Sequence, residues 1–186
     1  DFIEIDDKKF LRVLYVSKLP KSITPRFYNR LTTLEEINLI TTLNISPTNS
    51  AKMIKQVDKS LSAMETERLE KIKRAGKSNL DYEWVKDKKL ETRISNAEQL
   101  QYDLQKNNQK IFKNNFLVCI SANSFEELED QTVKVQEVAA EMLVEMKPLL
   151  WQQLEGLQNI LPLGHNSLQF QRTLTSEATA VNVPFN

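Results

Sequence analysis

The sequence predicts an α+β fold in which apolar strands pack against helices and a charged helical hairpin is set apart. Three observations predict it. Three segments rich in β-branched and aromatic residues have the composition of strands. The middle of the chain repeats apolar residues at spacings of three and four between charged ones, which is a helical period. Only three of the 186 residues are glycine, which favours helix over an all-strand fold.

The first third of the chain is expected to form a strand, a short helix and a second strand. The first strand is Phe10–Val16, which ends before Pro20. The helix is Pro25–Leu34, with Thr24 as its N-cap and a proline at the first helical position, where no N–H is needed. The second strand is Glu36–Ile45, although its imperfect alternation also allows a helix.

From about residue 49 to 112 the pattern indicates two helices joined by a polar turn that begins at Gly76. Their apolar stripes are narrow and would bury little surface against a globular core. We therefore expect an antiparallel hairpin that packs mostly on itself and projects. The stripe residues are Ile54, Val57, Leu61 and Met64 in the first helix, and Leu90, Ile94, Ala97 and Leu104 in the second.

The strongest strand is Phe116–Ala122, and a capping box follows it. Ser124 can accept a hydrogen bond from the backbone N–H of Glu127, whose carboxylate reaches back to the start of the helix. A short strand near Val144–Leu149 and a helix at Trp151–Ile160 complete the pattern. The expected buried face of the capped helix comprises Leu128, Val135, Val138, Met142 and Met146.

The order of these elements, with the hairpin removed, is β-α-β-β-α-β, which is the order of a ferredoxin-like sandwich. The hairpin would then be an insertion between the two middle strands. We expect residues 1–160 to form this α+β domain, with the insertion at about 49–112, and residues 161–186 to be a linking segment.

Composition limits the classes of function. The formal net charge is zero, so no overall field attracts the chain to nucleic acid or membrane. Cys119 is the only cysteine and His165 the only histidine, which excludes an internal disulfide or a Cys/His zinc site and favours a reducing, cytosolic compartment. The longest apolar run, Phe116–Ile120, is far shorter than the roughly 20 residues that span a bilayer, so any membrane contact is expected to be peripheral.

No residue pattern predicts catalysis, a cofactor site or a metal site in this chain. Gly76-Lys77-Ser78 ends like a phosphate-binding loop, but Lys71 stands where that loop needs its first glycine. The strand at 113–120 has asparagine and leucine where an RNA-recognition motif places stacking aromatics, so Phe116 and Ile120 are expected in the core. A catalytic triad around His165 could be assembled only by assumption, so His165 is expected to be a loop residue.

The predicted tip of the hairpin is basic and carries two aromatics, Tyr82 and Trp84. Such a tip could contact an anionic membrane surface or DNA, although a solvated tip is the simpler interpretation. The basic residues before the turn are Lys71, Lys73, Arg74 and Lys77, and those after it are Lys86, Lys88 and Lys89.

The last segment is poor in charge and carries three short motifs: Leu161-Pro-Leu-Gly-x-Asn166, Arg172-x-Leu-Thr175 and Pro184-Phe185. In these motifs the chain resembles the end of the N-terminal domain of the large conjugative-transfer ATPase, the hexameric motor of type IV secretion systems. Within that family, the chain looks similar to versions from Gram-positive mobile elements. The positions that carry the resemblance are Leu161, Pro162, Gly164, Asn166, Arg172, Thr175, Pro184 and Phe185.

The resemblance implies a non-catalytic assembly and docking domain. In that family the following domain holds the Walker motifs, so ATP and Mg²⁺ are expected only there. The implied partners are secretion-channel proteins at the cytoplasmic face of the inner membrane, the protein's own ATPase domain, and further copies of the chain. Nucleic acid or membrane binding through the basic tip is the alternative.

Overall fold

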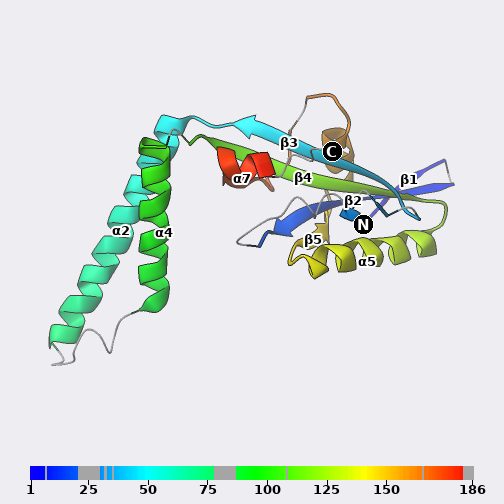
Figure 1. Cartoon of the computed structure of the whole chain (residues 1–186). Coiled ribbons are helices and arrows are strands. Elements are labelled where there is room, and N and C mark those ends of the chain that lie inside the picture. Colours follow the sequence, from blue (N-terminus) through cyan, green and yellow to red (C-terminus); the bar gives the residue numbers. More distant parts are fainter. Residues whose placement is uncertain are drawn as a thin grey trace. The chain divides into compact units, whose positions relative to one another are not determined.

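The computed structural model describes residues 1–6, 8–20, 30–31, 33–34, 36–77, 87–107, 109–164 and 166–181, which adopt a mixed α+β fold (Figure 1). The chain divides into two compact units. The sheet unit comprises Asp1–Pro47 and Phe112–Asn186, and the hairpin unit comprises Thr48–Ile111.

The sheet has six strands in the described part of the chain, with β1, β2, β4 and β3 adjacent in that order. The register pairs Val13 with Cys119 between β2 and β4, and Ile40 with Cys119 between β3 and β4, and both pairings are antiparallel. β5 also pairs with β2 and β6 with β4. The strands are β1 (Ile3–Ile5), β2 (Lys9–Lys18), β3 (Asn38–Pro47), β4 (Ile111–Ala122), β5 (Glu145–Pro148) and β6 (Arg172–Thr175).

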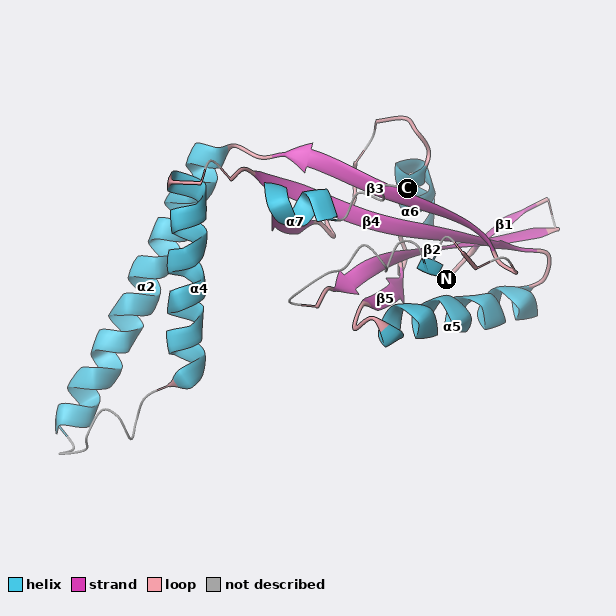
Figure 2. Ribbon diagram, viewed as in Figure 1, coloured by secondary structure: helices cyan, strands magenta, loops and turns pink. Residues whose placement is uncertain are grey.

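Helices cover both faces of the central strands. α5 (Phe125–Glu141) packs on the face that carries Leu14 and Val118, whereas α6 (Gln153–Ile160) packs on the face that carries Val13 and Leu117 (Figure 2). Because neighbouring residues of a strand point to opposite faces, both sets of side chains in β2 and β4 are buried. This explains why these strands read as continuous apolar runs rather than as alternating ones.

The expected strands and helices around β4 are confirmed, with corrected boundaries. β4 begins at Ile111, five residues before the predicted start at Phe116, because Lys113–Asn115 pair with β3 despite their low strand propensity. The segment at 36–45 is a strand and not a helix, and it is displaced to Asn38–Pro47. The strand near Val144–Leu149 and the helix at Trp151–Ile160 are β5 and α6.

The capping box at α5 differs in one bond from the expected one. The hydroxyl of Ser124 accepts from the N–H of Glu127 at 3.1 Å, as predicted. The Glu127 carboxylate reaches back to the N–H of Asn123, at 2.9 Å, one residue before the N-cap. Met146, which was expected on the buried face of this helix, lies in β5, and its side chain still joins the same core.

Some expectations fall outside the described residues, and some elements were not predicted. Most of the helix expected at Pro25–Leu34 lies outside the described part. No residue pattern indicated β1, β6 or the short helix α7 (Ser176–Val181), all of which have six residues or fewer.

The hairpin unit contains two antiparallel helices, α2 (Ser50–Lys77) and α4 (Lys88–Gln105). Their apolar seam follows the predicted stripes, with Met64, Leu90 and Ile94 buried and Leu61 and Ala97 packed against them. Polar pairs continue the seam: Gln101 donates to Asp58 at 2.6 Å, Arg68 pairs with Glu91 at 3.7 Å, and Lys71 pairs with Asp87 at 2.8 Å.

Replacing Gly156 by alanine is expected to destabilise the sheet unit by about 1 kcal/mol, although glycine-to-alanine changes in helices normally stabilise. Gly156 lies where α6 approaches β2, and an added Cβ would stand 2.4 Å from Leu149 Cδ1 and 3.0 Å from Val13 Cγ1. Both neighbours are fully buried, so neither can move freely. Equilibrium urea unfolding measures the change.

The matched control is Gly76→Ala in the last turn of α2, where an added Cβ meets no heavy atom within 4 Å. This substitution should raise stability by up to about 1 kcal/mol through helix propensity alone. Equal stabilisation of both variants would show that the close approach of α6 to β2 has no energetic consequence.

Candidate functional site: the exposed apolar surface around α6

α6 is fixed to the sheet by a buried side-chain amide. Val13 donates its backbone N–H to Gln153 Oε1 at 2.7 Å, and Gln153 Nε2 donates to the carbonyl oxygens of Leu149 and Val13 at 2.7 and 3.2 Å. At the other end of α6, Thr42 and Asn44 of β3 donate to the carbonyl oxygens of Ile160 and Asn159. These bonds hold both ends of α6 and therefore the side chains that it displays.

The turn before α6 presents Trp151 to solvent. Trp151 has a backbone φ of 62°, which is an unfavourable conformation for a bulky residue, and its side chain is 90% exposed. Its N–H donates to the carboxylate of Asp1 at 2.7 Å. Backbone conformations of this kind cost free energy and often occur at functional positions.

Large apolar side chains are exposed at both ends of α6. At least 60% of each side chain before or at the start of the helix is accessible, and about half or more of each side chain after it. Between Lys147 and Arg172 the only acidic or basic residue besides His165 is Glu155. We name this set the α6 surface, which comprises Leu150, Trp151, Leu154, Leu161 and Leu163.

The first resemblance motif forms the loop that leaves α6. Leu161 and Leu163 belong to the α6 surface, Pro162 is exposed, and Gly164 has a φ of 66°. Asn159 anchors the loop, because its side-chain oxygen accepts from the Ser167 N–H at 3.0 Å and its nitrogen donates to Ser167 Oγ at 2.9 Å. The position of Gly164 thus requires the left-handed conformation that glycine adopts without strain.

The remaining positions of this motif have different surroundings. Asn166 is half-buried, and its side-chain oxygen and nitrogen are enclosed without a hydrogen-bond partner among the described residues. His165 lies outside the described residues, so the expectation that it is a loop residue stays a prediction.

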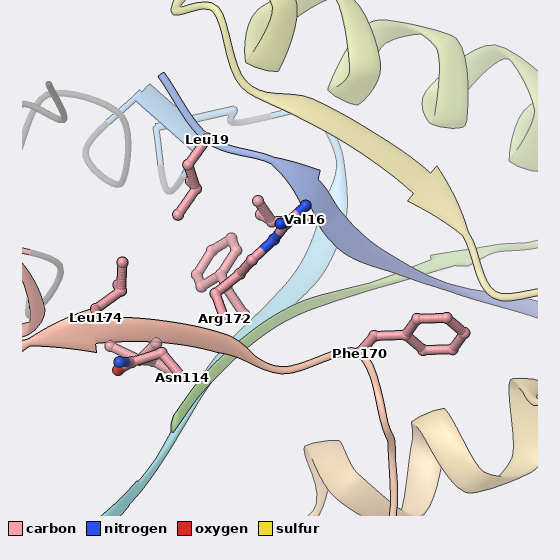
Figure 3. Close-up of a pocket in the computed structure, with 8 residues that line it drawn as sticks. Val16, Leu19, Asn114, Phe170, Arg172 and Leu174 are labelled. Carbon is pink, nitrogen blue, oxygen red and sulfur yellow. The ribbon is translucent and has the colours of Figure 1, made fainter. Parts of the chain in front are cut away.

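The second resemblance motif is β6. Thr175 caps α7, since its hydroxyl accepts from the Ala178 N–H at 3.3 Å, and α7 is tied to β4 by a 3.0 Å bond from Asn114 Nδ2 to Thr179 Oγ1. The side chain of Arg172 extends from β6 toward Val16 (Figure 3). Pro184 and Phe185 lie outside the described residues.

Arg172 lines a small pocket between β6 and the end of β2. Leu19 and Leu174 point into this space, whereas Phe170 points away from it (Figure 3) and its ring stacks on Tyr15. The enclosed volume is about 20 Å³, which is room for one water molecule. This pocket is therefore too small for a substrate or a nucleotide.

The four basic residues predicted before the hairpin turn divide into two kinds. Lys71 contacts Asp87 at 2.8 Å and Glu67 at 3.0 Å, and these hydrogen bonds raise the pKa of Lys71 above its ordinary value. Arg74 lies 3.6 Å from Glu70. Lys73 and Lys77 are exposed. Lys86, Tyr82 and Trp84 lie outside the described residues, as does Ser78.

Asp87 has a structural role at the start of α4. Its carboxylate accepts from the N–H groups of Lys89 and Leu90 as the N-cap of the helix. The hydrogen bond from Lys71 and these backbone bonds lower the pKa of Asp87. Lys71 and Asp87 thus join the two helices, which leaves Lys71 less available to an external anion than Lys73 or Lys77.

The described residues contain no group of three or more His, Cys, Asp or Glu side chains arranged to hold a metal ion. Burial raises the pKa of the Cys119 thiol to about 11, so this cysteine is protonated at neutral pH. Within the described ranges, no helix combines the length and apolarity that crossing a membrane requires.

Phe116 and Ile120 are buried in the core, as predicted. The opposite face of β4, which carries Leu117 and Cys119, is covered by α6 and by Leu168.

No known family model matches the chain, and no curated protein matches it.

Proposed function

We propose that this chain is the non-catalytic N-terminal docking domain of a conjugative-transfer ATPase of the type IV secretion class. The motifs at Leu161–Asn166 and Arg172–Thr175 support this assignment through their resemblance to that family. ATP and Mg²⁺ would bind to a separate domain that carries the Walker motifs. The partners would be channel proteins at the cytoplasmic face of the inner membrane.

We further propose a ferredoxin-like topology for the sheet unit. The strand order β5, β2, β4, β3 supports it, as does α5, which connects β4 to β5 across one face. The hairpin helices lie between β3 and β4 in the chain, where an insertion between the middle strands would be.

The α6 surface is the observation that carries the docking function. Exposed clusters of large apolar side chains are typical of binding surfaces. The cores of protein interfaces are depleted in charge and enriched in aromatic residues, and tryptophan is frequent among residues that dominate binding energy. The α6 surface has one tryptophan and four leucines, with Glu155 as the only carboxylate nearby in the sequence.

Replacing Trp151 by alanine and Leu154 by serine in the complete motor tests the proposal. Co-purification with the channel proteins should fall about tenfold or more, because the removed side chains are the exposed apolar ones. ATP hydrolysis should be unchanged. The matched control is Leu69→Ala in α2, which removes a leucine that is 54% exposed but lies outside the α6 surface.

Unchanged co-purification in the double variant would refute docking through α6. The family assignment has its own test in the reading frame that follows Asn186. We expect it to encode a glycine-rich loop ending in Gly-Lys-Ser or Gly-Lys-Thr within roughly the next hundred residues. A stop codon there would refute the assignment whatever the result of the docking test.

Nucleic acid or membrane binding through the hairpin tip is the alternative function, and Lys73 and Lys77 are the exposed cations that favour it. Replacing Lys71, Lys73, Arg74 and Lys77 by glutamate would abolish salt-dependent DNA binding if this alternative holds. The same variant would leave channel-protein binding unchanged if the docking function holds.

A further inference from the structure

The two units of the chain have opposite net charges, which sum to zero. Residues 48–111, the hairpin unit, contain 14 lysines and arginines but 10 aspartates and glutamates, which gives +4. The residues of the sheet unit contain 11 basic and 15 acidic residues, which gives −4. One molecule therefore carries two surfaces of opposite charge.

The basic charge is concentrated on the outer side of α2. Five of its six lysines follow a helical spacing that places them opposite the seam residues Leu61 and Met64, whereas Lys71 contacts Asp87 of α4. These five are exposed, and none of them forms an ion pair with a carboxylate among the described residues. We name this set the lysine face, which comprises Lys52, Lys55, Lys59, Lys73 and Lys77.

The acidic charge is concentrated on the outer side of α5, opposite its buried residues Leu128 and Val135. We name Glu126, Asp130 and Glu137 the acid face; all three are exposed, and none forms an ion pair with a described cation. Val133, which is 50% exposed, lies on the same side of the helix. An apolar side chain flanked by carboxylates fits a helix that presents small residues between lysines.

α2 presents such a surface. Ala63 and Thr66 are exposed on the lysine face between Lys59 and Lys73, and the carboxylate on the same side, Glu70, pairs with Arg74 at 3.6 Å. Neighbouring residues on one side of a helix are about 5–6 Å apart, so both faces repeat charges at the spacing of helical turns. The two faces therefore carry mainly opposite charges at helical spacings.

We propose that the lysine face of α2 docks on the acid face of α5 of a second copy of this chain. The occupant is a second copy because the chain itself carries the complementary surface. Nucleic acid fits less well, since the acid face and the net charge of −4 on the sheet unit would repel phosphates. This inference does not rest on the proposed function.

The proposed contact is heterologous, because it joins two different elements and leaves one face of each kind free at the ends. Repetition of such a contact builds a ring if the rotation closes and a filament if it does not. Exposed ion pairs are individually weak and are screened by salt, so the assembly should be reversible and sensitive to ionic strength.

Charge reversal tests the proposal. The first variant carries Lys52→Glu, Lys55→Glu and Lys59→Glu, and the second carries Glu126→Lys, Asp130→Lys and Glu137→Lys. Glu127 is left intact because it takes part in the α5 cap. Sedimentation velocity over a range of protein concentrations, at about 0.02 M and about 0.5 M salt, measures the association.

The wild-type chain should associate at low salt and dissociate at high salt. Each variant alone should associate at least about tenfold more weakly, because both of its faces then have the same sign. An equimolar mixture of the two variants should associate again, since each restores the partner of the other. Circular dichroism checks that each variant is folded, and Glu126→Gln, Asp130→Asn and Glu137→Gln together form a milder second variant.

The charge-matched control replaces Lys88, Lys89 and Lys106, exposed residues at the ends of α4, by glutamate. It should associate like the wild type. A wild-type chain that remains monomeric at low salt, a mixture that fails to restore association, or an equal loss in the control would each overturn the proposal. Loss of DNA binding in the first variant without rescue by the second would assign the lysine face to nucleic acid instead.

Discussion

Replacing Gln153 by leucine is expected to lower the free energy of unfolding by about 2–4 kcal/mol, although leucine has a similar size and is more apolar. Gln153 is 6% exposed, and its amide bonds to Val13 and to the carbonyl of Leu149. The pairing of β1 with β2 ends at Leu11, and that of β5 with β2 begins at Leu14. Between these two pairings, Val13 has no strand partner on this edge of β2. The Gln153 side chain accepts the hydrogen bond of the Val13 N–H there.

Leucine would leave the N–H of Val13 buried without its partner. The free-energy penalty of a buried N–H without a hydrogen bond is larger than the net free energy that the hydrogen bond contributes. The matched control is Gln152→Leu, at the preceding residue, whose side chain makes no capping bond to α6. Equilibrium urea unfolding should give less than about 0.5 kcal/mol for the control. Equal losses in both variants would mean that the amide of Gln153 does not complete the strand edge.

The core strands could be predicted from the sequence because their pattern is local. β2 and β4 are buried on both faces, so each appears as an uninterrupted apolar run, and the Ser124 cap marks the start of α5. The hairpin seam was predictable for the same reason, since its apolar residues follow the helical period.

The bonds between Gln153 and Val13 could not be predicted, because they join residues 140 positions apart in the sequence. The local sequence around a buried glutamine near a helix start is the same as around an exposed one. Gln153 is buried and hydrogen-bonded because β2 has no strand partner between its pairings with β1 and with β5. The early start of β4 has a similar cause: Asn114 and Asn115 belong to the strand because β3 lies beside them.

The candidate site was predictable only in part. The low charge and the motifs of the last segment mark Leu161 and its neighbours, but nothing in the sequence distinguishes Leu150, Trp151 and Leu154 from core residues of a short helix. Their exposure depends on the orientation of α6 and on the positive φ of Trp151, and neither has a sequence signal.

Replacing Leu117 by alanine should cost about 2–5 kcal/mol of stability, the range for truncating a fully buried leucine. Leu117 is inaccessible to solvent in the central strand β4, between Tyr15 of β2 and Thr42 of β3 in the register. Its side chain belongs to the core under α6, where Leu149 and Leu168 are also buried. The cavity would be enclosed by the sheet on one side and by α6 on the other, so relaxation could fill it only partly.

The matched control for Leu117 is Leu163→Ala, which makes the same chemical change at a leucine that is 67% exposed. Urea unfolding should give less than about 0.5 kcal/mol for this variant. A large loss there would mean that the α6 surface is part of the folded core. If stability is unchanged, any loss of partner binding by Leu163→Ala reports on docking alone, because an exposed side chain that does not stabilise the fold can affect binding only through the partner that it contacts.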